Sequence, residues 1–99
     1  MITAEHISIL ETIELISDSF DGAVKVYTNG SCVKFAMLLE YFHPGGEVLY
    51  DLNHAIYEYN GVCYDITGMV EKGSHRPLKE FGWKEIRNAL NLKGSFKVL

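Results

Sequence analysis

The chain has 99 residues and a mass of 11.2 kDa, a length that fits one domain over residues 1–99. Hydrophobic residues make up 47% of it and charged residues 22%, as in ordinary folded proteins. The net charge of −4, with no basic run, excludes phosphate-driven binding to nucleic acid, and no apolar stretch reaches the roughly 18 residues that a membrane span needs.

A helix and a short strand are the first elements expected along the chain. Apolar residues recur at helical spacing over residues 4–19, and Thr3 is a plausible N-cap. The expected apolar stripe consists of Ile7, Leu10, Ile13, Ile16 and Phe20, and it is widened by Ile9 and Leu15. Asp21-Gly22 ends this helix, and two valines then predict a brief strand over Ala23–Tyr27.

The next element is expected to be a buried helix. Cys32–Phe42 is strongly apolar, begins directly after the turn cluster Thr28–Ser31 and is ended by His43–Gly46. Glu47–Leu52 fits either a strand or an extended connection. A helix with so few polar residues is expected to be covered on most sides.

The strongest local signal is a hairpin around Asn60-Gly61, which lies between the arms His54–Tyr59 and Val62–Thr67. A two-residue turn there sets Asp65 opposite Ile56 and makes it a diagonal neighbour of His54 on the same face. Their Cβ atoms are then about 7 Å apart, a gap that an imidazole and a carboxylate can bridge.

After the hairpin, which Gly68 is expected to end, the sequence predicts a polar loop over Glu71–Arg76 and a weaker helix across residues 83–92. Trp83 is expected in the core, and Ser95–Val98 fits a closing edge strand. The order of helices and strands predicts an α+β fold.

Cys32 is the candidate nucleophile of an acyl-transfer site. A thiolate attacks carbonyl groups, and the positive end of a helix dipole favours the thiolate over the thiol. Cys32 lies in the first turn of its helix, where free backbone N–H groups could also receive an oxyanion. His54 is the candidate base, and Asp65 is the carboxylate that would orient its imidazole.

The run Asn29-Gly30-Ser31-Cys32-x-x-Phe35-Ala36, followed by His54–Gly68, resembles the papain-like cysteine peptidase superfamily. More narrowly, it is similar to the small transglutaminase-like and bacterial amidohydrolase branches, whose motifs run Cys, His, Asp. In those relatives the cysteine opens a central helix packed on an antiparallel sheet that carries the histidine. The resemblance therefore implies a minimal papain-like core with a Cys-bearing central helix and a His/Asp hairpin.

The resemblance also implies roles for single residues. Cys32 would be the nucleophile, His54 the general base and Asp65 the orienting residue. Papain has a glutamine for the oxyanion six residues before its cysteine, and this chain has Val26 there. The polar side chains near Cys32 that could serve the oxyanion or the substrate instead are Asn29, Ser31 and Tyr27.

The implied activity is thiol-dependent hydrolysis or acyl transfer at a peptide, isopeptide or side-chain amide bond, with a protein or peptide as substrate. No cofactor is implied, because the nucleophile is a side chain, and no CxxC or HxxxH spacing favours a metal site. The two cysteines and the absence of a signal peptide predict reduced thiols and a cytoplasmic location.

Other interpretations stay open. The protein could be a non-catalytic binding module or inhibitor built on a degenerate cysteine-peptidase fold. Cys63 is expected in the core, with a resolving thiol or a disulfide with Cys32 as the minor alternative. The aromatic hairpin face with Tyr57, Tyr59 and Tyr64 is expected to pack on a helix, or else to form an exposed patch for a partner or a homodimer. His6 and His75-Arg76 are expected at solvated positions.

Overall fold

The computed structural model describes residues 3–19, 21–28 and 31–89. The elements in chain order are α1 (Ala4–Ser17), α2 (Ala23–Thr28), α3 (Cys32–Phe42), β1 (Glu47–Tyr50), β2 (Ala55–Tyr59), β3 (Val62–Asp65), β4 (Gly68–Val70), β5 (Arg76–Pro77), the 3-10 helix η1 (Leu78–Glu80) and α4 (Trp83–Ala89). The predicted α+β fold class is confirmed. Every helix in these ranges is too short or too polar to cross a membrane.

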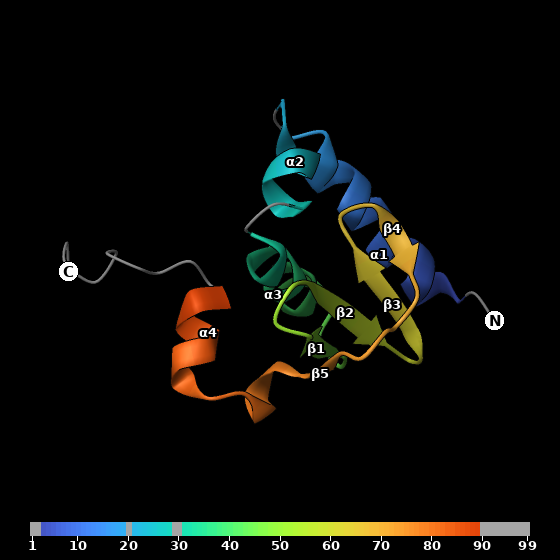
Figure 1. The fold of residues 1–99 in the computed structure, drawn as a ribbon. Helices are drawn as coiled ribbons and strands as arrows, with labels where there is room; N and C mark the ends of the chain where they lie inside the picture. Colours follow the sequence, from blue (N-terminus) through green and yellow to red (C-terminus); the bar gives the residue numbers. More distant parts are fainter. Residues whose placement is uncertain (1–2, 20, 29–30, 90–99) are drawn as a thin grey trace.

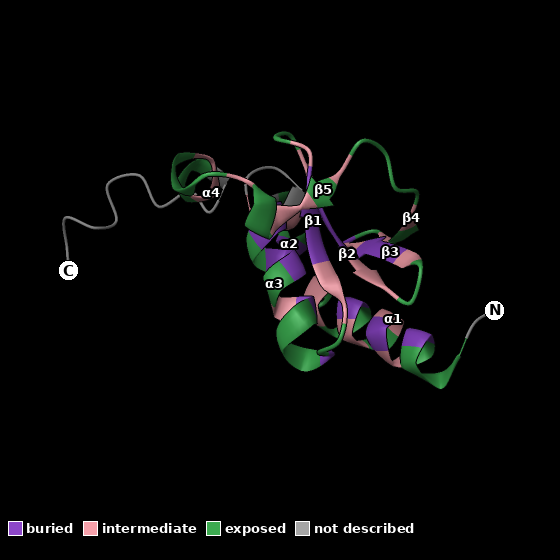
Figure 2. Cartoon of the chain, turned by 90° about the horizontal axis from the view of Figure 1, so that it is seen from below, coloured by how far each residue is buried: buried purple, intermediate pink, exposed green. Residues whose placement is uncertain are grey.

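The strands form one antiparallel sheet in the order β4-β3-β2-β1-β5. Strands that are neighbours in the chain are neighbours in the sheet, except that β5 pairs with the outer edge of β1. Helix α3 packs on the central strands, while α1 lies next to α3 and β4 (Figure 1). The chain between β4 and β5 crosses the sheet on the side away from α1 (Figure 2).

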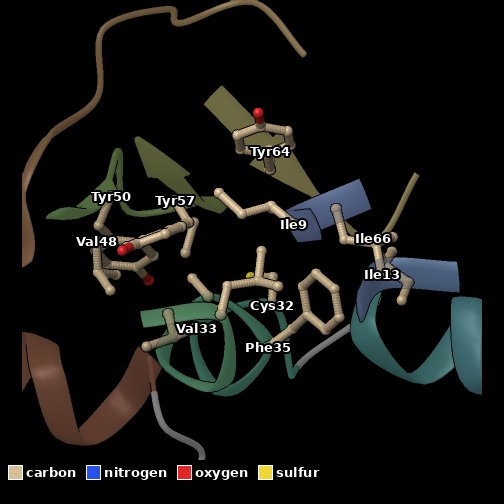
Figure 3. Close-up of a cluster of buried hydrophobic side chains, with 13 residues drawn as sticks. Ile9, Ile13, Cys32, Val33, Phe35, Val48, Tyr50, Tyr57, Tyr64 and Ile66 are labelled. Carbon is tan, nitrogen blue, oxygen red and sulfur yellow. The ribbon is translucent and has the colours of Figure 1, made fainter. Parts of the chain in front are cut away.

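Side chains alternate between two apolar layers along the strands. The larger layer lies between the helices and the sheet, and its side chains appear in Figure 3. On the sheet it comprises Val48, Tyr50, Ala55, Tyr57 and Tyr64. The smaller layer covers the opposite face and consists of Leu49, Ile56 and Cys63, with Val70 packed against it.

Helix α1 begins as predicted, because the Thr3 hydroxyl accepts the backbone N–H of His6 at 3.4 Å. Its buried residues are His6, Ile9 and Ile13. Three expectations here were wrong: Ile7 is 51% exposed, Leu15 is 73% exposed, and His6 is only 2% exposed. Phe20 lies outside the described residues. The buried His6 ring has a polar partner, because its Nδ1 lies 2.5 Å from the Tyr64 hydroxyl.

The strand expected over Ala23–Tyr27 is wrong, because this segment is the helix α2. Ala23 is 1% exposed, and Tyr27 packs on Phe35 of α3 with ring centroids 5.3 Å apart. In a helix, positions 23 and 27 lie one turn apart, within about 6 Å of each other, whereas a strand would separate them by about 13 Å. Burial of this pair outweighs the strand preference of the valines, which amounts to about 1 kcal/mol or less.

The hairpin is confirmed in its register, since Tyr59 pairs with Val62 and Tyr57 with Tyr64. Asn60 and Gly61 both have positive φ, at 48° and 83°, as a type I′ turn requires. Tyr57 and Tyr64 are fully buried, so the aromatic face packs inside the chain and the exposed-patch alternative is wrong. The hairpin also continues beyond Gly68, because β4 pairs with β3.

The C-terminal part was predicted only partly. Helix α4 begins at Trp83 as expected, but Trp83 is 60% exposed and therefore not a core residue. The expected end of this helix near residue 92 and the strand over Ser95–Val98 lie outside the described residues. Instead of a loop alone, the structure has the edge strand β5 before η1.

Candidate active site

Cys32 is the first residue of α3, directly after the N-cap Ser31. The Ser31 side chain makes no capping hydrogen bond, and the first intrahelical bond runs from Phe35 N to Ser31 O. The N–H groups of residues 32–34 therefore have no partner within the helix. Their partial positive charge lies beside the Cys32 thiol, as the sequence predicted.

The thiol lies on the helix side of the sheet. Cys32 is 9% exposed and belongs to the larger apolar layer, as Figure 3 shows. Tyr50 of β1 belongs to the same layer, and burial, then the charges of Cys32 and Asp51, raise the pKa of its hydroxyl. The surroundings of Cys32 are thus mainly apolar, with one phenol nearby.

His54 and Asp65 meet as the hairpin register predicted. His54 Nε2 lies 2.9 Å from Asp65 Oδ2, and their side chains are 31% and 13% exposed. Asp65 Oδ1 accepts a second bond from the backbone N–H of Thr67 at 2.7 Å and another from the Thr67 hydroxyl. Asp65 is thereby fixed at the end of β3, and it holds the imidazole in turn.

The hydrogen bond to Asp65 determines which imidazole nitrogen is available. Because a carboxylate only accepts, His54 Nε2 carries the proton of the neutral ring. His54 Nδ1 then has a free lone pair, and it makes no hydrogen bond with any described residue. An oriented imidazole with one bare nitrogen is what a general base needs.

The structure does not join Cys32 to this pair. Among the described residues, the Cys32 thiol forms no hydrogen bond with His54. Asp65 follows the core residue Tyr64, so alternation directs its side chain to the face opposite α3. The bond between His54 and Asp65 is therefore present, whereas contact between nucleophile and base is not.

The three candidate residues for the oxyanion or the substrate differ in their surroundings. Tyr27 is partly buried and packs against Phe35. Ser31 is half-buried, and its hydroxyl is not used to cap α3. Asn29 lies outside the described residues. The backbone N–H groups that begin α3 are described donors that belong to the same helical turn as Cys32.

Cys63 lies in the core as expected, on the face of the sheet away from Cys32. It is 5% exposed, and both cysteines are free thiols. Burial, then the neighbouring charge of Glu58, raises the pKa of the Cys63 thiol. A raised pKa disfavours the reactive thiolate, so Cys63 has a packing role.

Two residues beside His54 were missed by the sequence analysis. Asp51 Oδ1 accepts the backbone N–H groups of Asn53 at 2.9 Å and His54 at 2.7 Å. His75, expected at a solvated position, has a side chain that is only 9% exposed and lies 3.6 Å from Asp51 Oδ2. An Asp side chain often accepts the backbone N–H groups of the residues that follow it and so forms a turn. That tendency was the available signal for the contacts of Asp51 with Asn53 and His54.

The described residues bring together no group of three His, Cys, Asp or Glu side chains suited to a metal ion. No curated protein and no solved structure matches the chain. One family model, Phage YunG-like protein, matches residues 5–96, which is nearly the whole sequence and includes Cys32, His54 and Asp65. The chain therefore belongs to the Phage YunG-like protein family.

Proposed function

We propose that this protein is a thiol-dependent hydrolase or acyl transferase that acts on a peptide, isopeptide or side-chain amide bond. Cys32 is the nucleophile, His54 the general base and acid, and Asp65 the residue that orients His54. The observation that carries the proposal is the 2.9 Å bond between His54 Nε2 and Asp65 Oδ2, which leaves His54 Nδ1 free.

The position of Cys32 at the beginning of α3 supports its role. The unpaired N–H groups of the first helical turn stabilise negative charge, both on the thiolate and on an oxyanion that forms next to it. This backbone site does not depend on a polar side chain at position 26, where the sequence has Val26.

The reaction runs through two acyl-transfer steps. The Cys32 proton moves to His54 Nδ1, and the thiolate adds to the carbonyl carbon of the amide. The C–N bond breaks as His54 returns the proton to the leaving amine, which gives a thioester on Cys32. Water, deprotonated by His54, then hydrolyses the thioester, or a second amine takes the acyl group.

The proposal requires Cys32 Sγ and His54 Nδ1 to approach each other when substrate binds. That approach must go around the end of the sheet, because Asp65 faces away from α3 while His54 lies directly before the first residue of β2. Half-exposed His54, at 31% exposure of its side chain, is open to a substrate from solvent. Asp65 is more deeply buried and keeps the ring orientation during such a movement.

Alkylation of Cys32 by iodoacetamide as a function of pH tests the proposal. The measurement uses the Cys63→Ser background, so that one thiol reacts. We expect rapid alkylation already at pH 6, and a much lower rate at that pH in His54→Ala. His6→Gln is the matched control, because it changes a buried histidine of α1 away from Cys32.

One observation favours a second candidate, a non-catalytic binding module. Cys32 is 9% exposed within the larger apolar layer and is not bonded to His54. On this alternative Cys32 is a packing residue, and its alkylation at pH 6 is slow in both His54 backgrounds. That result would reject the enzyme and leave the binding module.

A further inference from the structure

Residues 71–75, here called the strap, connect the two opposite edges of the sheet, β4 and β5. Neighbouring strands are about 4.8 Å apart, so four spacings separate the edges by about 19 Å. When the paired residues are followed from strand to strand, Val70 of β4 lies level with Glu47 of β1. Arg76 of β5 lies level with Tyr50 of β1 instead. This offset of three residues adds about 10 Å along the strands.

The strap is short, since six residue steps join Val70 to Arg76 and extended chain of that length reaches about 20–22 Å. It bends at Ser74 and arches over one face of the sheet (Figure 2). Lys72 of the strap lies 3.8 Å from Glu58 of β2, which places the strap over the smaller apolar layer. A short connection that contacts the sheet limits the positions open to the residues that it carries.

The last residue of the strap, His75, is held next to His54. Their ring centroids are 6.4 Å apart in an edge-on arrangement. His75 Nδ1 accepts the Gly73 N–H at 3.2 Å, so in the neutral ring Nε2 carries the proton. That Nε2 is buried, has no hydrogen-bond partner among the described residues, and lies 3.6 Å from Asp51 Oδ2.

Asp51 in turn holds the backbone of His54 on both sides. Its Oδ1 accepts the His54 N–H at 2.7 Å, and its own N–H donates to the His54 carbonyl at 3.2 Å. Leu52, between them, has a φ of +75°, so the turn is tight. Burial raises the pKa of Asp51, but the Asn53 and His54 N–H groups and the nearby histidines outweigh it, and the net pKa is lowered.

We infer that Asp51 and His75 are positioning residues for His54, and that the short strap keeps His75 against them. Asp65 fixes the tip of the imidazole, while Asp51 fixes its backbone and His75 closes its flank. In the free protein these contacts together favour one orientation of the His54 ring, in which Nε2 is bonded to Asp65 and Nδ1 is not. The inference rests on the proposed role of His54 as the base.

The test is a long-range ¹H–¹⁵N NMR measurement on His54 in the full chain. In the unmodified protein we expect the Nε2–H tautomer and slow solvent exchange of that proton. Asp51→Ala, and separately an insertion of two glycines between Gly73 and Ser74, are expected to mix the tautomers and speed the exchange about tenfold or more. Two glycines inserted after Gly22, a turn with open space around it, are the control and leave His54 unchanged.

His75 is tested by a matched pair of variants. His75→Phe keeps the ring beside His54 but removes both nitrogens, so the tautomers should mix. His75→Gln keeps an N–H donor towards Asp51 and should restore the original spectrum in large part. An unchanged His54 spectrum in Asp51→Ala and in the strap insertion, with both variants folded by circular dichroism, overturns the inference.

Alkylation of Cys32 in the same variants separates this inference from the proposed function. If His54 responds as expected but does not activate Cys32 in the unmodified protein, the proposed function fails and the positioning stands as a structural role only. If Cys32 is activated and its rate falls roughly ten- to a hundredfold in Asp51→Ala and in the insertion, both hold. If Cys32 is activated and the variants leave its rate unchanged, the positioning inference alone is rejected.

Discussion

The Nε2 atom of His43 lies 2.7 Å from the hydroxyl oxygen of Thr12, which ties the end of α3 to the middle of α1. His43 is 7% exposed, and its Nδ1 lies 3.1 Å from Glu5. The buried imidazole thus has a partner on each nitrogen, both from α1. The attachment of α1 to the rest of the domain depends in part on this polar contact.

Replacement of Thr12 by Val tests this contact. The change keeps the shape of the side chain but leaves one nitrogen of His43 buried without its partner, so we expect the free energy of unfolding to fall by about 1–3 kcal/mol. Urea unfolding measures the difference. Thr12→Ser, which keeps the hydroxyl, is the control, and equal stability of the Val and Ser variants would contradict the prediction.

Gly46 is predicted to tolerate no side chain. A Cβ atom there would lie 2.2 Å from the Glu58 carbonyl oxygen and 2.6 Å from the Tyr57 ring. Gly46→Ala must push the beginning of β1 away from β2, and we expect it to cost about 1–3 kcal/mol in thermal or urea unfolding.

Gly73→Ala is the matched control for Gly46. A Cβ atom at position 73 meets only the His75 ring, at an ordinary contact distance of 3.6 Å. We expect a change within about 0.5 kcal/mol. A loss of stability as large as that of Gly46→Ala would show that glycine flexibility, and not the close approach of β2, explains the first result.

The stability contributed by Asp51 should depend on pH. Its pKa is lowered in the folded state, so the folded protein binds a proton there less readily than the unfolded chain does. The stabilisation is therefore complete above the unfolded pKa of about 3.9 and is lost as the pH falls through the lower folded value. Asp51→Asn should destabilise the protein at pH 7 and much less at pH 2–3.

Unfolding curves of both proteins across this pH range measure the difference. Glu71→Gln is a suitable control, since Glu71 is an exposed carboxylate on the strap. A stability difference between Asp51→Asn and the unmodified protein that stays constant from pH 7 to pH 2 would contradict a lowered pKa.

Cys63 is predicted to be unreactive at neutral pH. In a Cys32→Ser background, burial and the charge of Glu58 hold its thiol above the usual pKa, so alkylation should become fast only above pH 8.5, which is about the free-thiol value. Mass spectrometry after a timed exposure to iodoacetamide measures the modified fraction. Glu58→Gln removes one cause and should move the midpoint downward, whereas rapid alkylation at pH 7 would disprove the burial of Cys63.

The part of the site that was predictable from sequence depends on local turn chemistry. Asn60-Gly61 adopts two positive φ values, which sets the register of β2 and β3 and hence the meeting of His54 with Asp65. Cys32 at the beginning of α3 likewise follows from the turn residues before it and the apolar run after it. Both features are determined by residues that are close together in the chain.

The remaining features depend on contacts that the sequence does not mark locally. Helix α2 forms because Ala23 and Tyr27 face the other helices, and short propensity patterns do not contain that information. The pairing of Arg76 with Tyr50, and the burial of His75 that goes with it, joins segments far apart in the chain. The absence of a contact between Cys32 and His54 likewise depends on long-range packing, because Cys32 and Asp65, the partner of His54, lie on opposite faces of the sheet.

Pro77 occupies the outer edge of the sheet, where it pairs with Leu49. Proline has no backbone N–H, so β5 offers an incomplete set of donors to any strand that approaches from outside. The opposite edge, β4, is only three residues long and begins with a glycine. Neither edge strand is therefore a good template for strands of other molecules. The proline in β5 and the shortness of β4 disfavour edge-to-edge polymerisation of the sheet.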